Sequence, residues 1–318
     1  MSDYVRFHQN QSALFRRLGQ RARLMDALRA FFRGLGFVEI ETPIVCTSPG
    51  VETHLAALET KACGHAKYLT TSPEFHMKRL LAVGFDKVFQ VTKAFRDGEL
   101  GDRHNPEFSM VEWYRVDADY NVMMDDTQAL LQFLTKTLWS SYVVPEAPGV
   151  RPAIDMGGRW ERIPFKVAFE RAGLGDPAAM DFDERCLALV DTVEGSIGRH
   201  APEFLIEYPA DMASLALLKS GDPSVAERFE CYAGGLELCN GFSELPDADL
   251  YVERCEADLA ARASMGLPLY PIDHRYVSML REGLPRCAGN ALGFDRVVML
   301  LTGAANLSEV IAFPFDQA

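Results

Sequence analysis

The sequence lacks two features that would place the protein in or across a membrane. No apolar run reaches about 18 residues, the length at which a membrane-spanning helix is expected. The first residues, Met1–Arg6, are polar and contain no apolar signal core. These absences predict a cytoplasmic protein with no membrane partner.

Paired cysteines are also missing. The chain has seven cysteines, an odd number, and none of them forms a C-x-x-C pair. Cys63 and His65 are too isolated from other candidate ligands for a zinc site. We therefore expect reduced thiols, as is usual for proteins of a reducing compartment.

Basic residues are fewer than acidic residues in this chain. The chain carries 32 Lys and Arg against 45 Asp and Glu, a net charge of −13. Proteins that follow an extended nucleic acid gain affinity from many Lys/Arg–phosphate contacts. The acidic balance weakens that reading without excluding a local basic patch, and a small anionic ligand held by a few arginines fits it well.

The common nucleotide and hydrolase motifs are absent: a Walker P-loop, G-x-G-x-x-G, H-E-x-x-H and G-x-S-x-G. Two other segments, Phe95–Phe108 and Gly289–Arg296, each carry an arginine beside a turn or a strand–helix junction. A guanidinium group can pair with two phosphate oxygens at once. Arg96 and Arg296 therefore predict a nucleoside triphosphate site without a P-loop.

Hydrophobic periodicity gives the coarse organisation of the 318 residues, 48% of which are apolar. A helix is expected over Ser12–Leu35. The other expected elements are strands over Phe37–Pro43, Lys87–Phe95, Glu107–Asp117, Phe204–Tyr208, Arg228–Ala233 and Leu236–Phe242, helices over Val122–Trp139, Phe165–His200, Ala248–Met265 and Arg296–Thr302, a connection over Val144–Pro164 and a turn over Gly289–Gly293. Strands without βαβ alternation predict an α+β fold with a mainly antiparallel sheet.

Two glutamates flank a hairpin signal, the pair Gly234-Gly235. If these glycines form the loop, Tyr232 faces Glu237, and Glu230 lies diagonally from Glu237 on the same face. Two converging carboxylates favour a cation such as Mg²⁺ between them. The alternative is an acidic pair of strands that faces solvent.

The strand expected over Glu107–Asp117 places an aromatic ring, a carboxylate and a phenol on one face, from Phe108, Glu112 and Tyr114. Such a face can stack a base and orient an amine. An ordinary half-buried strand would show the same pattern.

The loop Asp97–Pro106 joins two of the expected strands and carries Arg103, His104 and Asn105. These side chains are candidate phosphate or ribose donors, although a polar surface loop would look similar. In Gly289–Arg296 the residues are small at alternate positions, which lets a ligand approach the backbone. The alternative there is a packing-driven crossing of strand and helix.

Together these segments resemble the catalytic domain of class II aminoacyl-tRNA synthetases, and the lysine enzyme most closely. Gly36–Pro43 is similar to motif 1, the dimer-forming element, Phe95–Tyr114 to motif 2 and Gly289–Leu301 to motif 3. Glu237–Glu244 resembles the lysine-recognition strand. The resemblance implies a homodimer and a sheet of six to seven strands flanked by helices. It also implies a single catalytic domain over residues 1–318, without an N-terminal anticodon-binding barrel.

The resemblance implies ATP and Mg²⁺ as cofactors and assigns residues to them. Arg96 would clamp the substrate carboxylate and the α-phosphate, Arg296 the γ-phosphate, and Phe108 would stack on adenine. Glu230 and Glu237 would bind Mg²⁺. The nucleotide set as a whole is Arg96, Asp97, Gly98, His104, Asn105, Phe108, Glu237, Leu238, Gly293 and Arg296.

The implied amino-acid site has three parts. Ser72, Pro73 and Glu74 would position the backbone amine, Asn240 the carboxylate, and Glu244 and Tyr114 the side-chain ammonium. Simple strand alternation points Asn240 away from Glu237, so a β-bulge marked by Gly241 is expected to turn it back.

Two positions depart from the synthetase pattern. Gly98 stands where motif 2 has a glutamate that reads adenine, so Glu99 or backbone groups would serve there. Ala291 replaces the second glycine of motif 3, and together with the missing barrel it is similar to the protein-modifying paralogues of the lysine enzyme. Those paralogues attach (R)-β-lysine, or lysine, to a lysine of elongation factor P, and tRNA is not their acceptor.

The implied reaction has two steps: formation of an aminoacyl-adenylate from ATP, then transfer to an acceptor amine. Two alternatives remain open. One is a compact lysine-activating enzyme that charges tRNA or another carrier. The other is a synthetase-like sensor without catalysis, which the retention of Arg96, Arg296, Glu237 and Glu244 disfavours because a sensor needs no phosphate clamps.

Overall fold

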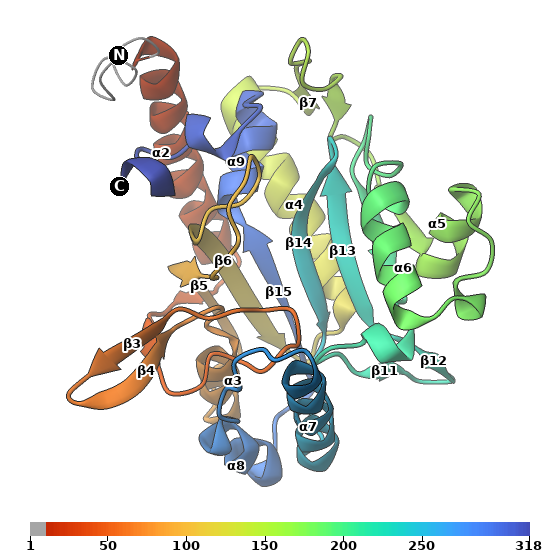
Figure 1. Ribbon diagram of the computed structural model, residues 1–318. Coiled ribbons are helices and arrows are strands. Elements are labelled where there is room, and N and C mark those ends of the chain that lie inside the picture. Colours follow the sequence, from red (N-terminus) through yellow and green to blue (C-terminus); the bar gives the residue numbers. More distant parts are fainter. Residues whose placement is uncertain (1–10) are drawn as a thin grey trace.

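The computed structural model describes residues 11–318, and the elements in this range surround one large twisted sheet (Figure 1). The order of its strands is β1-β5-β6-β15-β14-β13-β10-β9. The six strands from β5 to β10 in that order are antiparallel, and one short parallel strand is added at each edge. The strand bounds are β1 Val38–Glu39, β5 Lys87–Phe95, β6 Glu107–Val116, β9 Glu161–Pro164, β10 Glu203–Ile206, β13 Arg228–Ala233, β14 Leu236–Ser243 and β15 Cys287–Gly293.

The α+β, mainly antiparallel fold is thus confirmed, with eight strands in the sheet instead of six or seven. The two additional strands lie at the edges and have only two and four residues. Three small sheets lie outside the main one. They are formed by β2 Val45–Cys46, β4 His65–Leu69 and β3 Glu59–Ala62, by β7 Val143–Val144 and β8 Ile154–Asp155, and by β11 Leu218–Lys219 and β12 Asp222–Ala226.

Helices cover the two faces of the main sheet unequally. The far face in Figure 1 is packed by α4, which contacts β14 and β15, and by α9, which contacts β6 and β14; α2 packs against both of these helices. The largest apolar core lies there and includes Leu28, Phe32, Trp113 and Leu300. The near face is covered at its lower end by α3, α7 and α8 over a second core, and along β13, β10 and β9 by α5, α6 and the turn Leu189–Val193 over a third core that includes Tyr232. The remainder of the near face is left open.

The helices begin and end where local sequence signals stop them. In α4, Asp119 caps the first turn by accepting from the backbone N–H groups of Asn121 and Val122. In α9, Gly303 closes the helix with φ +68°, as expected for a glycine C-cap. The helix bounds are α2 Gln11–Gly34, α3 Glu74–Ala82, α4 Tyr120–Trp139, α5 Phe165–Arg171, α6 Phe182–Ala188, α7 Ala248–Ser264, α8 His274–Glu282 and α9 Phe294–Thr302.

Some expected elements differ from the structure. Gly289–Gly293 is not a turn but part of β15, in the middle of the sheet. The expected strand Phe37–Pro43 is reduced to β1, and the expected connection Val144–Pro164 contains β8 and β9. Phe165–His200 is divided into α5, α6 and a π-helical turn over Leu189–Val193.

Within residues 11–318, no helix combines the length and apolar character needed to cross a membrane.

Candidate active site

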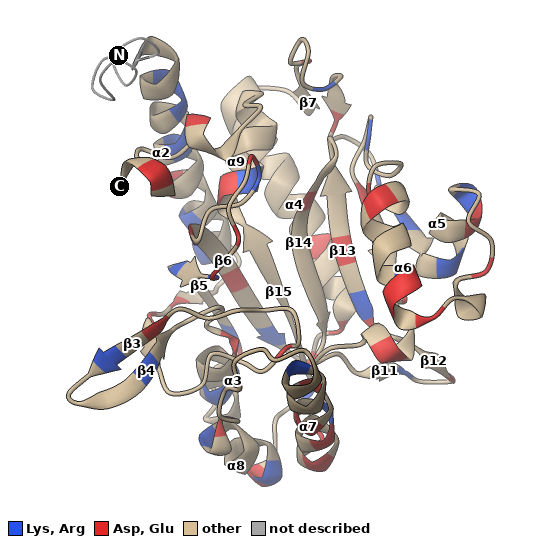
Figure 2. Cartoon of the chain, viewed as in Figure 1, with Lys and Arg blue, Asp and Glu red and all other residues tan. Residues whose placement is uncertain are grey.

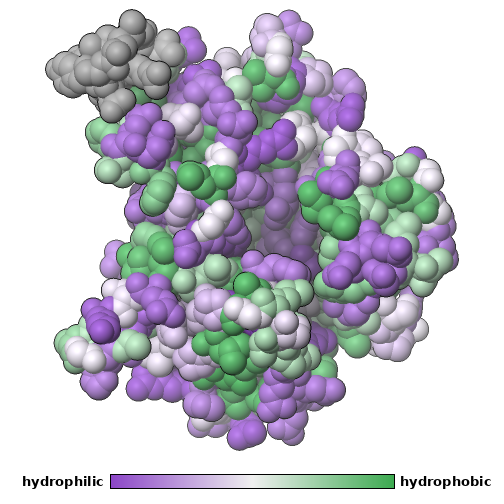
Figure 3. Space-filling view, in the orientation of Figure 1, coloured by the Kyte–Doolittle hydropathy of each residue, from purple (hydrophilic) through white to green (hydrophobic). Residues whose placement is uncertain are grey.

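The open face of the sheet is hollowed at its centre, and the hollow is lined by hydrophilic residues (Figure 3). Charged residues lie on the strands behind it, notably on β6 and β13 (Figure 2). At its lower end a cavity of about 260 Å³ lies between β6, β14 and β15, the segment before α3, and the loop that contains Glu52. The side chains that line it include Glu52, Ser72, Glu74, Arg96, Glu112, Tyr114, Asn240, Glu244 and Ala291.

Strand β15 forms the floor of this cavity. Gly289 lies opposite Tyr114, and Ala291 lies between Glu112 and Asn240 on the neighbouring strands. A Cβ atom at Gly289 would be 2.2 Å from the Tyr114 ring and 2.9 Å from Glu244 Oε1. Only glycine therefore leaves room for the tyrosine, and the alternating small residues serve to admit side chains from both neighbours.

A β-bulge sets the direction of the side chains on β14. Tyr232 pairs with Glu237 as expected, but Cys231 pairs with Cys239, which leaves Leu238 as the extra residue. Leu238 and Cys239 both enter the core, so Asn240 returns to the face that carries Glu237. The expected bulge exists, but it lies at Leu238 and not at Gly241. Because Leu238 is 1% exposed, only its backbone could contact a nucleotide.

An internal cation, Lys78, organises the amine end of the cavity. Its Nζ atom lies 2.6 Å from Glu244 Oε2 and 2.9 Å from Glu74 Oε2, and the lysine is 0% exposed. Burial alone would lower the pKa of Lys78, but Glu244 and Glu74 raise it well above its usual range. Glu74 and Glu244, which were assigned to substrate amines, thus already bind the ammonium group of Lys78. Glu244 Oε1 still has no hydrogen-bond donor.

Glu112 also lines this site, although the resemblance to the synthetases assigned it no role. Its Oε1 accepts from Ser72 Oγ at 2.6 Å, and its Oε2 accepts from the Tyr114 hydroxyl at 2.9 Å. Burial and the nearby Glu74 raise the pKa of Glu112 to about 7. Period-two alternation had already placed Glu112 on the face of Phe108 and Tyr114, so the signal for its role was present in the strand.

The raised pKa of Glu112 predicts a dependence of stability on pH. Between the unfolded value of 4.5 and about 7 the folded protein keeps a proton that the unfolded chain releases. The free energy of unfolding therefore contains a contribution that is complete below pH 4.5 and is lost as the pH rises through about 7. Glu112→Gln is expected to remove this contribution, so the unfolding midpoint falls less steeply with pH in the variant than in the wild type.

Thermal unfolding of both proteins at pH values from about 5 to about 8 measures this difference, which should reach a few kcal/mol at most. Glu59→Gln is the control, because Glu59 is exposed on β3. Parallel curves for the wild type and Glu112→Gln would show that the carboxyl group titrates normally.

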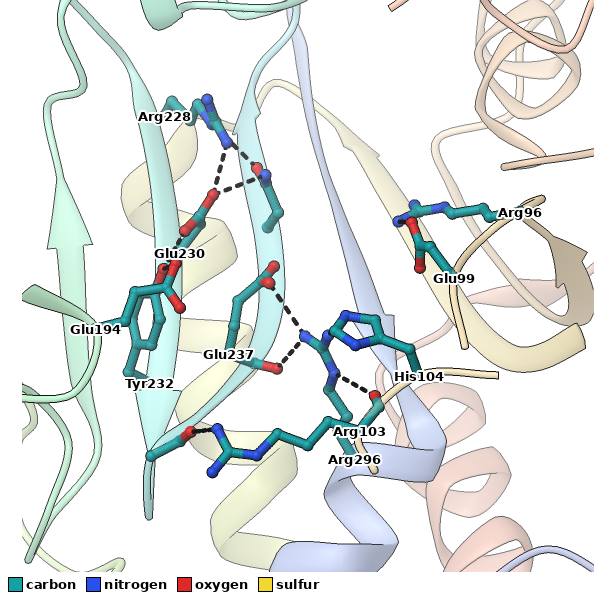
Figure 4. A network of polar contacts seen from close by, with 12 residues as sticks. Arg96, Glu99, Arg103, His104, Glu194, Arg228, Glu230, Tyr232, Glu237 and Arg296 are labelled. Carbon is teal, nitrogen blue, oxygen red and sulfur yellow. Dashed lines mark hydrogen bonds and ion pairs between the residues drawn. The ribbon is translucent and has the colours of Figure 1, made fainter. Parts of the chain in front are cut away.

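Arg296 lies in the first turn of α9 and points toward Glu237 and His104 (Figure 4). Its Nη1 donates to the Glu237 carbonyl at 3.0 Å and lies 3.1 Å from Glu237 Oε2. Its Nη2 is 2.7 Å from His104 Nε2, and its Nε donates to the Arg103 carbonyl at 3.4 Å. Three side chains assigned to the nucleotide, Arg296, Glu237 and His104, are therefore in contact.

The tautomer of His104 follows from this contact, because a guanidinium group can only donate. His104 Nε2 must accept, which requires a neutral ring. Burial and Arg296 both lower the pKa of His104, in agreement with that state. Arg103 adds a second link between the loop and the β13–β14 hairpin by donating to the Gly235 carbonyl at 2.7 Å.

Arg96 faces the hollow from the opposite side, at the end of β5 (Figure 4). Its guanidinium lies 5.2 Å from the centre of the Phe108 ring and 3.5 Å from Glu99. Its Nε is buried without a hydrogen-bond partner. Arg96 is thus in contact with Phe108, and Glu99 is the acidic residue that lies beside Arg96.

Other residues of the motif 2 loop have structural partners. Asn105 is 7% exposed, donates to the Glu107 carbonyl at 2.6 Å and accepts from the Phe315 N–H at 2.9 Å, so its side chain holds the loop and the C-terminal segment together. That engagement leaves little of Asn105 for a nucleotide. The Asp97 side chain accepts from the Gly98 N–H at 2.9 Å, and Gly98 has φ +78°.

The proposed metal ligands differ in how far they are already engaged. Glu230 Oε1 accepts from Arg228 at 2.6 Å and from Asn240 at 3.1 Å, and Oε2 accepts from the Tyr232 hydroxyl at 2.5 Å. Glu237 has a side chain that is 34% exposed, and its carboxylate forms an ion pair with Arg296. Glu237 is therefore free to reach a metal ion, whereas Glu230 must first release a donor.

The chain is similar to known proteins over nearly its whole length. A family model for tRNA synthetases class II (D, K and N) matches residues 3–317. The elongation factor P–(R)-β-lysine ligase of Vibrio vulnificus is 40% identical over 321 residues, 96% of this chain and 98% of the relative. The proteins of the same name from Yersinia enterocolitica and Vibrio cholerae are also 40% identical, over 316 and 321 residues. They cover 96% of this chain and 97% and 98% of their own lengths. The chain therefore belongs to the class II (D, K and N) family of tRNA synthetases.

Proposed function

We propose that this protein is an ATP-dependent ligase that activates (R)-β-lysine, or lysine, as an adenylate and transfers it to a lysine side chain of elongation factor P. The relatives that span nearly the full chain carry the name of that activity. The single observation that carries the proposal is the cavity, whose lining contains four glutamates and one arginine, Arg96. A dicationic amino acid with one carboxylate matches this distribution of charge.

The nucleotide would lie above the cavity, between Arg96 and Arg296. Arg96 has an Nε without a hydrogen-bond partner, and its guanidinium lies over the Phe108 ring. When the nucleotide binds, adenine would take the place of the guanidinium on this ring. Arg296 is anchored at the end of the hollow beside His104 and Glu237. Both guanidinium groups lower the pKa of His104, so both contribute a positive electrostatic potential at this ring.

Mg²⁺ would bind beside Glu237, which is partly exposed. Glu230 would be the second ligand after Arg228 or Asn240 breaks its hydrogen bond to Glu230 Oε1. When bound, the metal would neutralise charge on the phosphate oxygens. The chain's own contribution is positional: the bulge at Leu238 keeps Glu237 and Asn240 on one face. Gly293, at the start of α9, leaves the backbone open there.

In the first step the substrate carboxylate attacks the α-phosphate of ATP and pyrophosphate leaves. Arg96 would hold the carboxylate against the phosphate, and Asn240, which lines the cavity, would fix its second oxygen. Arg296 would stabilise the charge that gathers on the leaving phosphates. In the second step the ε-amine of the acceptor lysine attacks the acyl carbon, an amide forms and AMP leaves.

The acting protein would be a homodimer of single catalytic domains joined through motif 1. Large apolar side chains are exposed around β1: Leu35 is 42%, Val38 48% and Phe85 37% exposed. They lie near one another because β1 pairs with β5 and Lys87 Nζ donates to the Leu35 carbonyl. A second copy packed on this face would remove them from water.

Two assays test the function. ATP–pyrophosphate exchange with (R)-β-lysine and with α-lysine measures activation, and intact-mass analysis of elongation factor P measures transfer. The expected product is the acceptor with one additional β-lysyl group, with no charging of tRNA. Exchange without transfer to elongation factor P, together with charged tRNA, would support the alternative carrier. No exchange with either amino acid would leave a binding protein.

Ala291 is expected to contribute to the choice of amino acid. Its methyl group stands on the cavity floor between Glu112 and Asn240. Ala291→Gly should shift the ratio of kcat/KM values towards α-lysine by roughly 10-fold, because one methyl group discriminates by about 1–3 kcal/mol. The exchange assay with both amino acids measures this ratio, and an unchanged ratio would show that the methyl group has no part in selection.

A further inference from the structure

We propose that Glu52 binds the amino group that lies nearer to the substrate carboxylate and selects for amino acids that carry one. The proposal rests on the proposed function, since it assigns a residue to that substrate. Glu52 lies in the loop before β3, outside the segments similar to motifs 1 to 3. It is a contact residue of the cavity that also contains Arg96 and Glu74.

The first argument comes from the partners that the expected amine ligands already have. Ser72 Oγ donates to Glu112 Oε1 at 2.6 Å, and Glu74 Oε2 lies 2.9 Å from Lys78 Nζ. Lys78 also lies 2.6 Å from Glu244. Lys78 therefore already neutralises part of the negative charge of Glu74 and Glu244, the residues expected to bind the substrate amines.

Among residues 11–318 Glu52 has no ion pair, and its carboxyl group accepts a hydrogen bond from its own backbone N–H. Its Oε2 is buried and receives no hydrogen bond, although a buried carboxylate oxygen normally has a donor. Burial and Glu74 raise the pKa of Glu52 to about 7, and Arg96 acts in the opposite direction. An ammonium group placed here would supply the missing donor and the missing charge.

The backbone holds Glu52 in this position. Gly50 has φ +100°, and a Cβ atom there would be 2.4 Å from Glu52 Oε2, so the glycine makes room for the carboxylate. Arg262, which is 1% exposed, donates to the carbonyls of Glu52, Thr53 and Leu55 at 2.8, 3.1 and 2.9 Å. These hydrogen bonds fix the backbone of the loop, so the Glu52 side chain is in position before the substrate binds.

The position of Glu52 determines which amine it would bind. Arg96 is the group that would hold the carboxylate; it lines the same cavity as Glu52, and its charge lowers the pKa of Glu52. Glu244 and Tyr114 lie at the other end, over Gly289. An amino acid that spans the cavity thus brings its near amine to Glu52 and its far amine to Glu244 Oε1, which also lacks a donor.

The test compares two substrates that differ only in the near amine. (R)-β-lysine has it, and 6-aminohexanoic acid has the same carboxylate and far amine without it. Glu52→Gln should lower kcat/KM for (R)-β-lysine by roughly 10- to 100-fold, mostly through KM, and should change kcat/KM for 6-aminohexanoic acid by no more than about twofold. Glu52→Asp, which keeps the charge, should retain more activity than Glu52→Gln.

Glu59→Gln, on the exposed strand β3, is the matched control and should leave both substrates unaffected. The unfolding midpoint of Glu52→Gln should be no lower than that of the wild type, since an unsatisfied charge has been removed. An equal loss for both substrates would mean a structural role and overturn the proposal, as would unchanged kcat/KM for (R)-β-lysine. If the wild type activates no lysine at all, the proposed function itself fails, and that result is recognised before any variant is made.

Discussion

Replacing Arg296 with alanine is expected to lower the rate of adenylate formation by about 10³-fold or more, and to leave the fold intact. The guanidinium would stand where negative charge develops during phosphoryl chemistry, in a hollow where such charges count for more than in water. It also holds Glu237 and His104 in place, at 3.1 Å and 2.7 Å. Loss of Arg296 therefore removes one phosphate clamp and loosens two further groups.

Pyrophosphate exchange measures the effect, and thermal unfolding checks the fold. The loop that carries His104 should stay attached, because Arg103 still donates to the Gly235 carbonyl. Arg281→Ala is a suitable control, since the Arg281 side chain is 64% exposed and makes only a long contact of 3.6 Å with Asp249. Exchange within a few-fold of the wild type would place the nucleotide away from α9.

The second large effect is expected from Lys78→Met, which should lower the free energy of unfolding by about 3–5 kcal/mol. Lys78 is 0% exposed and lies between Glu74 and Glu244, at 2.9 Å and 2.6 Å. Removal of the ammonium leaves two carboxylates without a cation, one of them fully inside the protein. The rings of Phe242, Tyr114 and Tyr276 would also lose the charge that they surround at 5.1 to 5.9 Å.

Urea unfolding of three variants tests this prediction. Lys93→Met, which removes a half-exposed surface ion pair with Glu107, should cost no more than about 1 kcal/mol. Lys78→Met combined with Glu244→Gln should recover part of the loss, because one of the orphaned charges is gone. If the double variant is as unstable as Lys78→Met alone, the cost comes from lost packing and not from charge.

The hairpin could be predicted from the sequence because its signals are local. Gly234-Gly235 forms the turn, and Tyr232 faces Glu237 as the two-residue loop requires. The bulge at Leu238 could not be placed in the same way. Leu238 and Cys239 are both apolar, so either could belong to the core, and only packing against α4 and α9 shows that both do.

Strand β15 shows where propensity misleads. Its run of glycine, alanine and asparagine has little preference for a strand, and it was expected to turn. It is nevertheless extended, because β6 and β14 pair with it on both sides. Its small residues are required by the side chains of the neighbours, such as Tyr114 over Gly289, and these are distant in the sequence.

The internal cation and the loop carboxylate were missed for a related reason. A lysine in a short amphipathic segment is normally exposed, and α3 itself was not anticipated. Lys78 is buried because α8 covers α3 and because Glu244, the residue that follows β14, lies against it. Glu52 stands in an irregular loop with no period, so nothing local distinguishes it from any other acidic loop residue.

The attachment of the motif 2 loop has a consequence for synthesis of the protein. Asn105 accepts from the Phe315 N–H, and the Asp102 carbonyl accepts from the Leu307 N–H at 2.8 Å. Both donors are translated long after the loop that they fasten. A nascent chain still held by the ribosome at this point can complete most of the sheet, and Arg103 can already donate to the Gly235 carbonyl. Its loop still lacks the two bonds to Leu307 and Phe315, so nucleotide binding should strengthen once these residues are released.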